Sequence, residues 1–181
     1  MSYPDIMIDI ETLSSESNAV VVSIGAIAFD IKEGLSGNNP KKYIIFNTIR
    51  QIQDGRHIQD KTRTWWSKQS QVVQDELAKS YLVRVPVEYA LTEFTNWCTE
   101  QQAEHIWGNG NTFDNMVMRN LYKQYNCKYP VGFRGDLDMR TLKFLAPNVN
   151  VPRMGNHHNG LDDAVYQADV VCEMYADLYD I

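Results

Sequence analysis

The chain has 181 residues, of which 44% are apolar, and a formal net charge of −6 at pH 7. This length suits one domain with one substantial core, so we predict a single domain over residues 1–181. No apolar run reaches the roughly 20 residues of a membrane span, and no charged-then-apolar leader opens the chain. These features predict a cytoplasmic protein without membrane contact. The three cysteines include no Cys-x-x-Cys pair, which is typical of reduced thiols.

Strands are predicted mainly in the first third of the chain and helices after it. β-Branched and apolar runs predict strands over 6–10, 19–29, 43–48 and 104–107. Apolar residues at helical spacing predict helices over 61–69, 71–79, 87–102, 112–125, 139–145 and 161–178. Residues 34–40 and 150–159 are predicted to be a turn and a loop. Strands that alternate with helices indicate an α/β fold with a mixed sheet flanked by helices.

Two carboxylates interrupt the first predicted strand. Asp9 and Glu11 are two positions apart, and a strand projects such residues from the same face. Two ionised acids side by side repel each other, so the pairing favours a site for divalent cations, and oxygen ligands suit Mg²⁺ or Mn²⁺. The simpler alternative is that the strand ends at Asp9 and that Glu11 belongs to a solvated turn.

Two later motifs also carry acids. One is Gly-Asn-Gly-Asn-Thr-Phe-Asp, ending at Asp114, and the other is His-Asn-Gly-Leu-Asp-Asp-Ala, running from His158 through Asp163. Both acids fall in the first turn of a predicted helix, where exposed N–H groups favour a carboxylate for structural reasons alone. Asn159 is the predicted cap of the last helix. The structural reason does not account for the occurrence of both acids together with the Asp-x-Glu strand.

These three motifs, in this order, resemble those of the DEDDh 3′-to-5′ exonucleases of the DnaQ-like superfamily. Segments 64–66 (Thr-Trp-Trp) and 138–142 (Asp-Met-Arg-Thr-Leu) are further similar to exonuclease VIII and DexA-type enzymes, which are often encoded by phages or prophages. The resemblance extends from about Ile6 to Leu178. It implies a ribonuclease H-like fold and metal-dependent hydrolysis at the 3′ end of single-stranded nucleic acid, releasing 5′-mononucleotides. We expect DNA to be favoured over RNA as the substrate.

The resemblance also implies residue roles. Asp9 would bridge two Mg²⁺ or Mn²⁺ ions, Glu11 and Asp163 would ligate one of them, and Asp114 would serve the other. His158 would be the general base, because the family spacing fits His158 and Asp163 rather than their neighbours His157 and Asp162. Substrate contacts are expected from Thr12, Leu13, Asn111 and Phe113.

Two positions depart from the family pattern. Gly110 stands where the second motif commonly has asparagine, and Leu13-Ser14-Ser15 follows the first motif where glycine is common. Of Trp65 and Trp66, which point about 100° apart on a helix, we expect one ring in the core and at most one near substrate, and Trp107 in the core. We expect Asp138 and Arg140 to form a structural salt bridge in preference to a substrate contact.

The net negative charge is unusual for a nucleic-acid binder, although two divalent cations would bring the formal charge from −6 to −2.

Three alternative functions stay open. A binding module that acts through a partner would fit the fold without catalysis, and an exoribonuclease would fit the same motifs. Asp9 and Glu11 also match a variant of the loop of haloacid dehalogenase-like phosphatases, which would leave the His158 segment unexplained.

Overall fold

A five-stranded mixed sheet forms the centre of the protein. The computed structural model describes residues 2–153 and 159–180. The strand order is β3-β2-β1-β4-β5, with β1 pairing antiparallel to β2 and parallel to β4. The strands are β1 (Asp5–Thr12), β2 (Val21–Phe29), β3 (Lys41–Ile45), β4 (His105–Gly108) and β5 (Asp136–Asp138). This is the mixed sheet that the sequence predicts.

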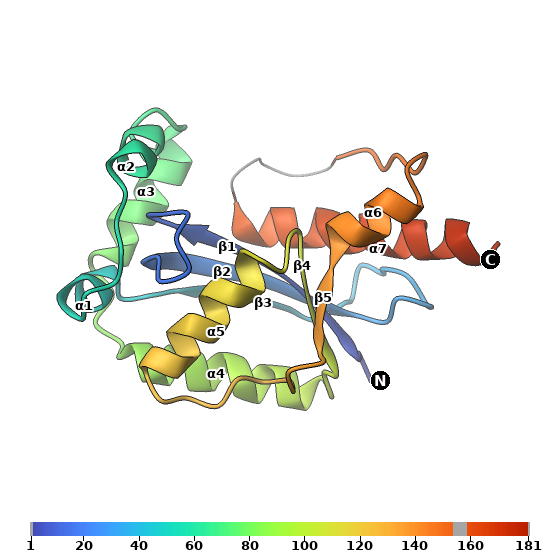
Figure 1. The fold of residues 1–181 in the computed structure, drawn as a ribbon, viewed down its shortest axis with the longest axis horizontal. Helices are drawn as coiled ribbons and strands as arrows, with labels where there is room; N and C mark the ends of the chain where they lie inside the picture. Colours follow the sequence, from blue (N-terminus) through green and yellow to red (C-terminus); the bar gives the residue numbers. More distant parts are fainter. Residues whose placement is uncertain (1, 154–158, 181) are drawn as a thin grey trace.

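Helices cover both faces of the sheet (Figure 1). Helices α4 and α5 lie against one face, α6 and α7 lie against the other, and α1–α3 form a lobe beside the ends of β1 and β2. The helices are α1 (Thr48–Gln53), α2 (Asp60–Trp66), α3 (Gln71–Ser80), α4 (Val87–Glu100), α5 (Asp114–Gln124), α6 (Met139–Leu145) and α7 (Gly160–Tyr179). Among the described residues, no helix is both long and apolar enough to cross a membrane.

The alternation of side chains along β1 determines which face bears its acids. Ile6, Ile8 and Ile10 point into the core under α4 and α5. Met7 points into the second core, under α7, and the period of two places Asp9 and Glu11 on that same face. The acids of β1 therefore face α7.

Three elements differ from the sequence prediction. The strand predicted over 43–48 ends at Ile45, because the side chain of Asn47 accepts a hydrogen bond from the Arg50 N–H and caps α1, a helix that was not predicted. The three residues of β5 were also not predicted. A three-residue strand is too short to show a periodic pattern, and it is held by parallel pairing with β4.

Tryptophans tie distant elements together. Trp66 is 1% exposed and its Nε1 donates to the Thr12 carbonyl at 2.9 Å, which fixes the lobe to the end of β1. Trp65 is 37% exposed, so one ring of the pair is in the core, as predicted. Trp107 is buried, as predicted, and its Nε1 donates to Asp5 Oδ1 at 2.9 Å.

Candidate active site

The strand β1 continues through both of its acids. Asp9 pairs with Gly25 and Glu11 pairs with Ser23 in the antiparallel ladder with β2, so Glu11 belongs to the strand and not to a turn. The simpler alternative for this segment, a strand ending at Asp9, is therefore wrong. Asp9 keeps partial access to solvent on the face covered by α7.

Helix α7 begins directly over the acids of β1 because glycines meet there. A Cβ added to Gly25 would lie 2.2 Å from the Gly160 carbonyl carbon and from the Leu161 nitrogen, and one added to Gly160 would lie 3.2 Å from the Asp9 carbonyl oxygen. The strand and the start of the helix can come this close only because neither residue at the contact has a side chain. Asn159 caps the helix, as predicted, with its Oδ1 accepting from the Asp162 N–H at 3.1 Å.

This contact brings three carboxylates together. One oxygen from each of Asp9, Glu11 and Asp163 lies within 4.8 Å of the other two. Asp163 is 9% exposed. Asp162 is not part of this group, as expected for helix neighbours that point about 100° apart.

Asp114 approaches the same carboxylates from the start of α5, next to the backbone of β1. It is 5% exposed at the first position of α5, and its Oδ1 accepts from the Ile10 N–H at 3.4 Å. The register between β1 and β4 pairs Asp5 to Met7 with His105 to Trp107, so Ile10 lies beyond that ladder. Asp114 thus takes a backbone donor that β4 does not reach.

The pKa values of Asp9, Glu11 and Asp114 are raised, as expected for acids buried close together. Burial, and then the charges of Asp9, Glu76 and Asp114, raise the pKa of Glu11 to about 9. Burial and the charge of Asp114 raise the pKa of Asp9, while burial raises that of Asp114. The cluster therefore disfavours full ionisation, and a bound cation would relieve this cost.

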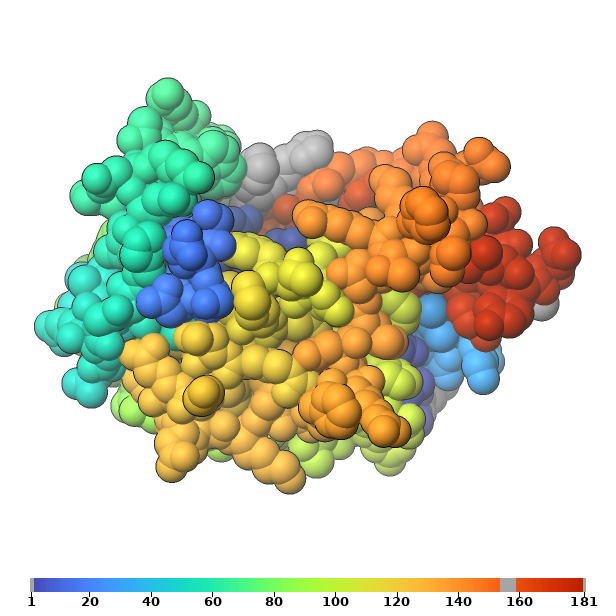
Figure 2. All heavy atoms as spheres, in the orientation of Figure 1, coloured from blue at the N-terminus to red at the C-terminus, as the bar shows by residue number. Residues whose placement is uncertain are grey.

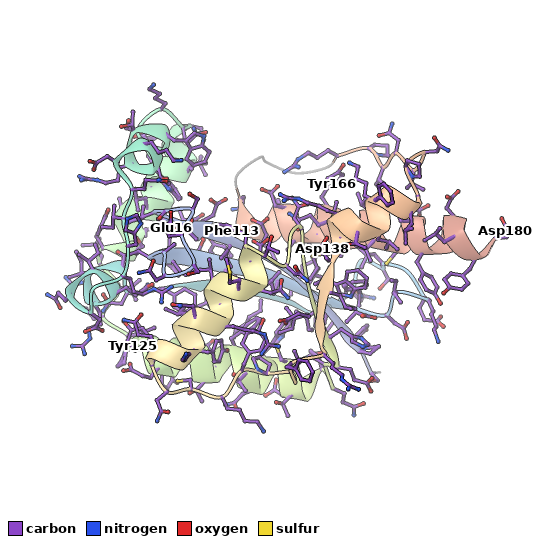
Figure 3. All side chains as sticks on the ribbon, viewed as in Figure 1. Glu16, Phe113, Tyr125, Asp138, Tyr166 and Asp180 are labelled. Carbon is purple, nitrogen blue, oxygen red and sulfur yellow. The ribbon has the colours of Figure 1, made fainter. Side chains whose placement is uncertain are left out.

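Three polar residues that the sequence analysis did not single out surround the cluster. Gln167 Nε2 donates to Asp9 Oδ1 at 2.7 Å, Arg153 forms an ion pair with Asp163, and Glu76 accepts from Ser23 Oγ at 2.5 Å. The guanidinium of Arg153 also lies 4.9 Å from the centre of the Tyr166 ring, which Figure 3 labels on α7. Only Gln167 had a sequence signal, because it follows Asp163 by four residues and so shares its helix face.

A cavity of about 420 Å³ adjoins Glu11. It is lined by the end of β1 and by α2, through Ile10, Glu11, Thr12, Lys61, Thr62 and Trp65. Thr12 lies in this wall, whereas Leu13 is fully buried with Val20 and Trp66. A fully buried side chain offers no surface to a ligand, so the burial of Leu13 gives no support to its predicted substrate contact.

The loop after β4 lies beside the start of α6. Asn111 donates its backbone N–H to Asp138 Oδ2 at 2.8 Å, and Phe113 packs partly against the core under α4 and α5. Asp138 also caps α6 by accepting from the Thr141 N–H at 2.8 Å. The predicted salt bridge between Asp138 and Arg140 is wrong, because no ion pair joins them in the described part of the chain; both oxygens of Asp138 serve backbone donors instead.

The predicted general base, His158, and its neighbour His157 lie outside the described residues. The role of His158 therefore stays a prediction of the sequence. The described residues on either side, Arg153 and Asn159, both lie close to α7 through the contacts given above.

Comparison with known families gives one match that spans nearly the whole chain. Residues 4–175 match the family model described as the 3′-5′ exoribonuclease Rv2179c-like domain. No curated protein matches the sequence.

Solved structures share the fold at low sequence identity. The nuclease domain of 3′hExo, a DEDDh family member bound to rAMP, has a TM-score of 0.63 at 14% identity, with 96% of this chain and 92% of that chain covered. E. coli exonuclease I in complex with a 5cy-dT13 oligonucleotide has a TM-score of 0.65 at 15% identity, with 99% of this chain and 41% of that chain covered. The protein thus spans about 41% of that exonuclease I chain. These similarities confirm the ribonuclease H-like fold.

Proposed function

The chain belongs to the 3′-5′ exoribonuclease Rv2179c-like domain family, and on that premise we propose that it removes nucleotides from the 3′ end of a single strand by two-metal hydrolysis. Its enzyme class is that of the 3′-5′ exonucleases. The observation that carries the detailed proposal is the group of carboxylates from Asp9, Glu11 and Asp163, with Asp114 beside it.

The donor set fits divalent cations. All four acids offer oxygen ligands, which Mg²⁺ and Mn²⁺ prefer, and the raised pKa values of Asp9, Glu11 and Asp114 mean that positive charge is favoured among them. Gln167 is 6% exposed, and its Oε1 has no hydrogen-bond partner among the described residues. A buried acceptor without a partner costs free energy, and a water on a bound ion would supply the missing donor.

Each residue has a defined task in this proposal. Asp9, Glu11, Asp163 and Asp114 hold the ions, and Gln167 fixes one oxygen of Asp9 so that the other is directed to the site. Bound ions would activate water and stabilise charge on the phosphoryl group. His158 accepts the proton of the attacking water, since a neutral imidazole can do so near neutral pH. The leaving group is the 3′ oxygen of the shortened strand.

The cavity beside Glu11 is suited to the terminal nucleotide. It opens next to Glu11, and Trp65 and Lys61 are among the residues that line it. A base stacked on an aromatic ring gains roughly 1–3 kcal/mol without sequence preference. Thr12, Asn111 and Phe113 remain our candidates for further substrate contacts.

We now favour RNA as the substrate. DNA is the substrate expected from the motifs, but the family is described as one of exoribonucleases. The particular closeness to exonuclease VIII and DexA-type enzymes, and with it a phage source, stays a prediction. The phosphatase alternative is dropped, because the family match covers all three motifs. A binding module that acts through a partner is the remaining rival, and turnover by the purified chain distinguishes the two.

The test is digestion of matched RNA and DNA strands, each labelled at the 5′ end, with Mg²⁺ or Mn²⁺. We expect a ladder that shortens from the 3′ end, faster on RNA, with no reaction in excess chelator and no cleavage of a circular strand. Asp163→Asn should lower turnover by about 10²-fold or more, as loss of a metal ligand does, while Asp162→Asn stays within a few-fold.

Three results would contradict the proposal. Early nicking of the circular strand would make the protein an endonuclease, and full activity in chelator would exclude the metal site. Equal loss of turnover in the Asp162 and Asp163 variants would show that the charge of the helix start, and not ligation by Asp163, is what matters.

A further inference from the structure

The guanidinium group of Arg140 rests on Gly110. A Cβ added to Gly110 would lie 3.0 Å from Nη1, 3.1 Å from Cζ and 3.4 Å from Nε of Arg140. The near equality of these distances means that the planar group lies across the glycine. Position 110 is where the family pattern commonly has asparagine, so this departure provides the space in which the guanidinium lies.

The surroundings of Arg140 are fixed by backbone hydrogen bonds. Asp138 joins the loop after β4 to the start of α6, because it accepts from the N–H groups of both Asn111 and Thr141, each at 2.8 Å. Figure 3 shows Asp138 where β5 passes into α6. Arg140 follows two residues later, so the base of its side chain is held relative to the loop that contains Gly110.

Arg140 is exposed and is close enough to Asp114 to lower the pKa of that carboxyl group. Among the described residues, no carboxylate lies within ion-pair distance of its guanidinium. The positively charged guanidinium of Arg140 thus lies near the candidate metal ligand Asp114 and is accessible from solvent.

The order of the strands places Arg140 on the side of the carboxylates opposite the nucleotide cavity. The parallel strands β1, β4 and β5 are neighbours, so the segments that follow them lie in that order along one edge of the sheet. The cavity is at the end of β1, Asp114 follows β4, and Arg140 follows β5. Figure 2 shows the green α2–α3 lobe and the orange segment that contains α6 on opposite sides of this face of the molecule.

We propose that Arg140 binds a backbone phosphate of the substrate on the 5′ side of the bond that is cut. This inference rests on the proposed function and adds a phosphate site that the family motifs do not assign. With the terminal nucleotide in the cavity and the scissile phosphate at the carboxylates, the preceding phosphate reaches the end of β5. A guanidinium suits this task, because its planar set of donors matches two phosphate oxygens.

The test compares Arg140→Ala with Lys143→Ala, which removes one positive charge from the same helix. For a single-stranded 10-mer RNA, Arg140→Ala should raise KM about tenfold, leave kcat within a few-fold and reduce the slope of log affinity against log salt by about 0.7, as loss of one phosphate contact does. A dinucleotide with a free 5′ hydroxyl carries only the scissile phosphate, so its hydrolysis should not change. Lys143→Ala should match the wild type throughout.

Two more variants distinguish the effect of the position of the guanidinium from the effect of its charge. Arg140→Lys keeps the charge and should recover part of the salt slope without recovering all of the affinity. Gly110→Ala keeps the arginine and displaces it, and should raise KM less than Arg140→Ala does.

A role limited to neutralising Asp114 would give a different result, and so would overturn the proposal. In that case Arg140→Ala would change Mg²⁺ affinity, measured by calorimetry, and would affect the dinucleotide as strongly as the 10-mer. An unchanged KM and salt slope would also overturn it. Binding of a fluorescent 10-mer RNA in Ca²⁺ gives the same salt slope without turnover, so a wild-type protein that binds but does not hydrolyse would contradict the proposed function and still test Arg140.

Discussion

At the scale of single residues, the candidate site depends on how each carboxylate is oriented. Asp9 has two oxygens, and Gln167 Nε2 occupies one of them at 2.7 Å. The amide must present its NH₂ group to an ionised carboxylate, so its carbonyl oxygen points elsewhere and has no partner among the described residues. Gln167 thus resembles the residues around a metal centre that orient a ligand without themselves binding the ion.

Replacing Gln167 should therefore weaken metal binding more than it weakens the fold. We expect Gln167→Ala to lower Mg²⁺ or Mn²⁺ affinity by roughly 10–100-fold, as loss of such orienting partners does. Titration calorimetry measures the affinity, and thermal melting of the metal-free protein checks the fold. Gln124→Ala is the control, because that glutamine bonds to Arg56 and to the Asp54 carbonyl through its own side chain. An unchanged metal affinity in Gln167→Ala would exclude the orienting role.

At the scale of elements, the approach of α7 to the sheet brings Asp163 to the acids of β1. Gly25 and Gly160 make that approach possible, since an added Cβ at Gly25 would lie 2.2 Å from the backbone of α7. The cap by Asn159 then fixes where the helix begins, and so which of its acids faces the sheet. A sheet, a helix start and a cap thus set the spacing of the carboxylates together.

Gly25→Ala should separate these elements. The new methyl group overlaps backbone atoms that cannot rotate away, so α7 must shift, and overpacking of this kind costs about 1–3 kcal/mol. We expect a lower melting temperature and a loss of metal affinity larger than the loss of stability alone would give. Gly37→Ala is the matched control, because nothing lies within 4 Å of an added Cβ there. Normal metal affinity in Gly25→Ala would show that α7 does not set the site.

At the scale of the whole molecule, the cluster makes stability depend on pH and on metal. Glu11 has a folded-state pKa of about 9 against an ordinary value of 4.5, because burial and neighbouring acids disfavour its charged form. Between these values the folded metal-free protein holds a proton that the unfolded chain has lost. The contribution of Glu11 to the free energy of unfolding is therefore fully present below about pH 4.5 and is lost as the pH rises toward 9.

The melting temperature of the metal-free protein should accordingly fall between pH 5 and pH 8.5. Mg²⁺ should raise it more at pH 8.5 than at pH 6, because the ion binds the ionised acids. Glu11→Gln, which cannot ionise, should flatten the fall. Differential scanning calorimetry in chelator and in Mg²⁺ measures both effects. A melting temperature that rises with pH in chelator would mean that the acids are not forced together.

The local features of this protein follow from its amino-acid sequence alone. The β1 segment bears two acids on one face because a strand has a period of two, and Asn159 caps α7 because its side chain is next to the free N–H groups. The helices with a clear apolar stripe were predicted within a few residues. The three motifs also indicated a 3′-5′ exonuclease, the enzyme class to which the family matched over residues 4–175 belongs.

Contacts between segments far apart in the chain depend on how the elements pack. The donation from Gln167 to Asp9 joins residues 158 positions apart, and the positions of Glu76 beside Ser23 and of Arg140 on Gly110 likewise depend on packing. Strand β5 and helix α1 were missed because they are short and are stabilised by pairing and capping rather than by a periodic pattern. Periodicity shows which face a side chain occupies, whereas the packed sheet and helices decide which other side chain it meets.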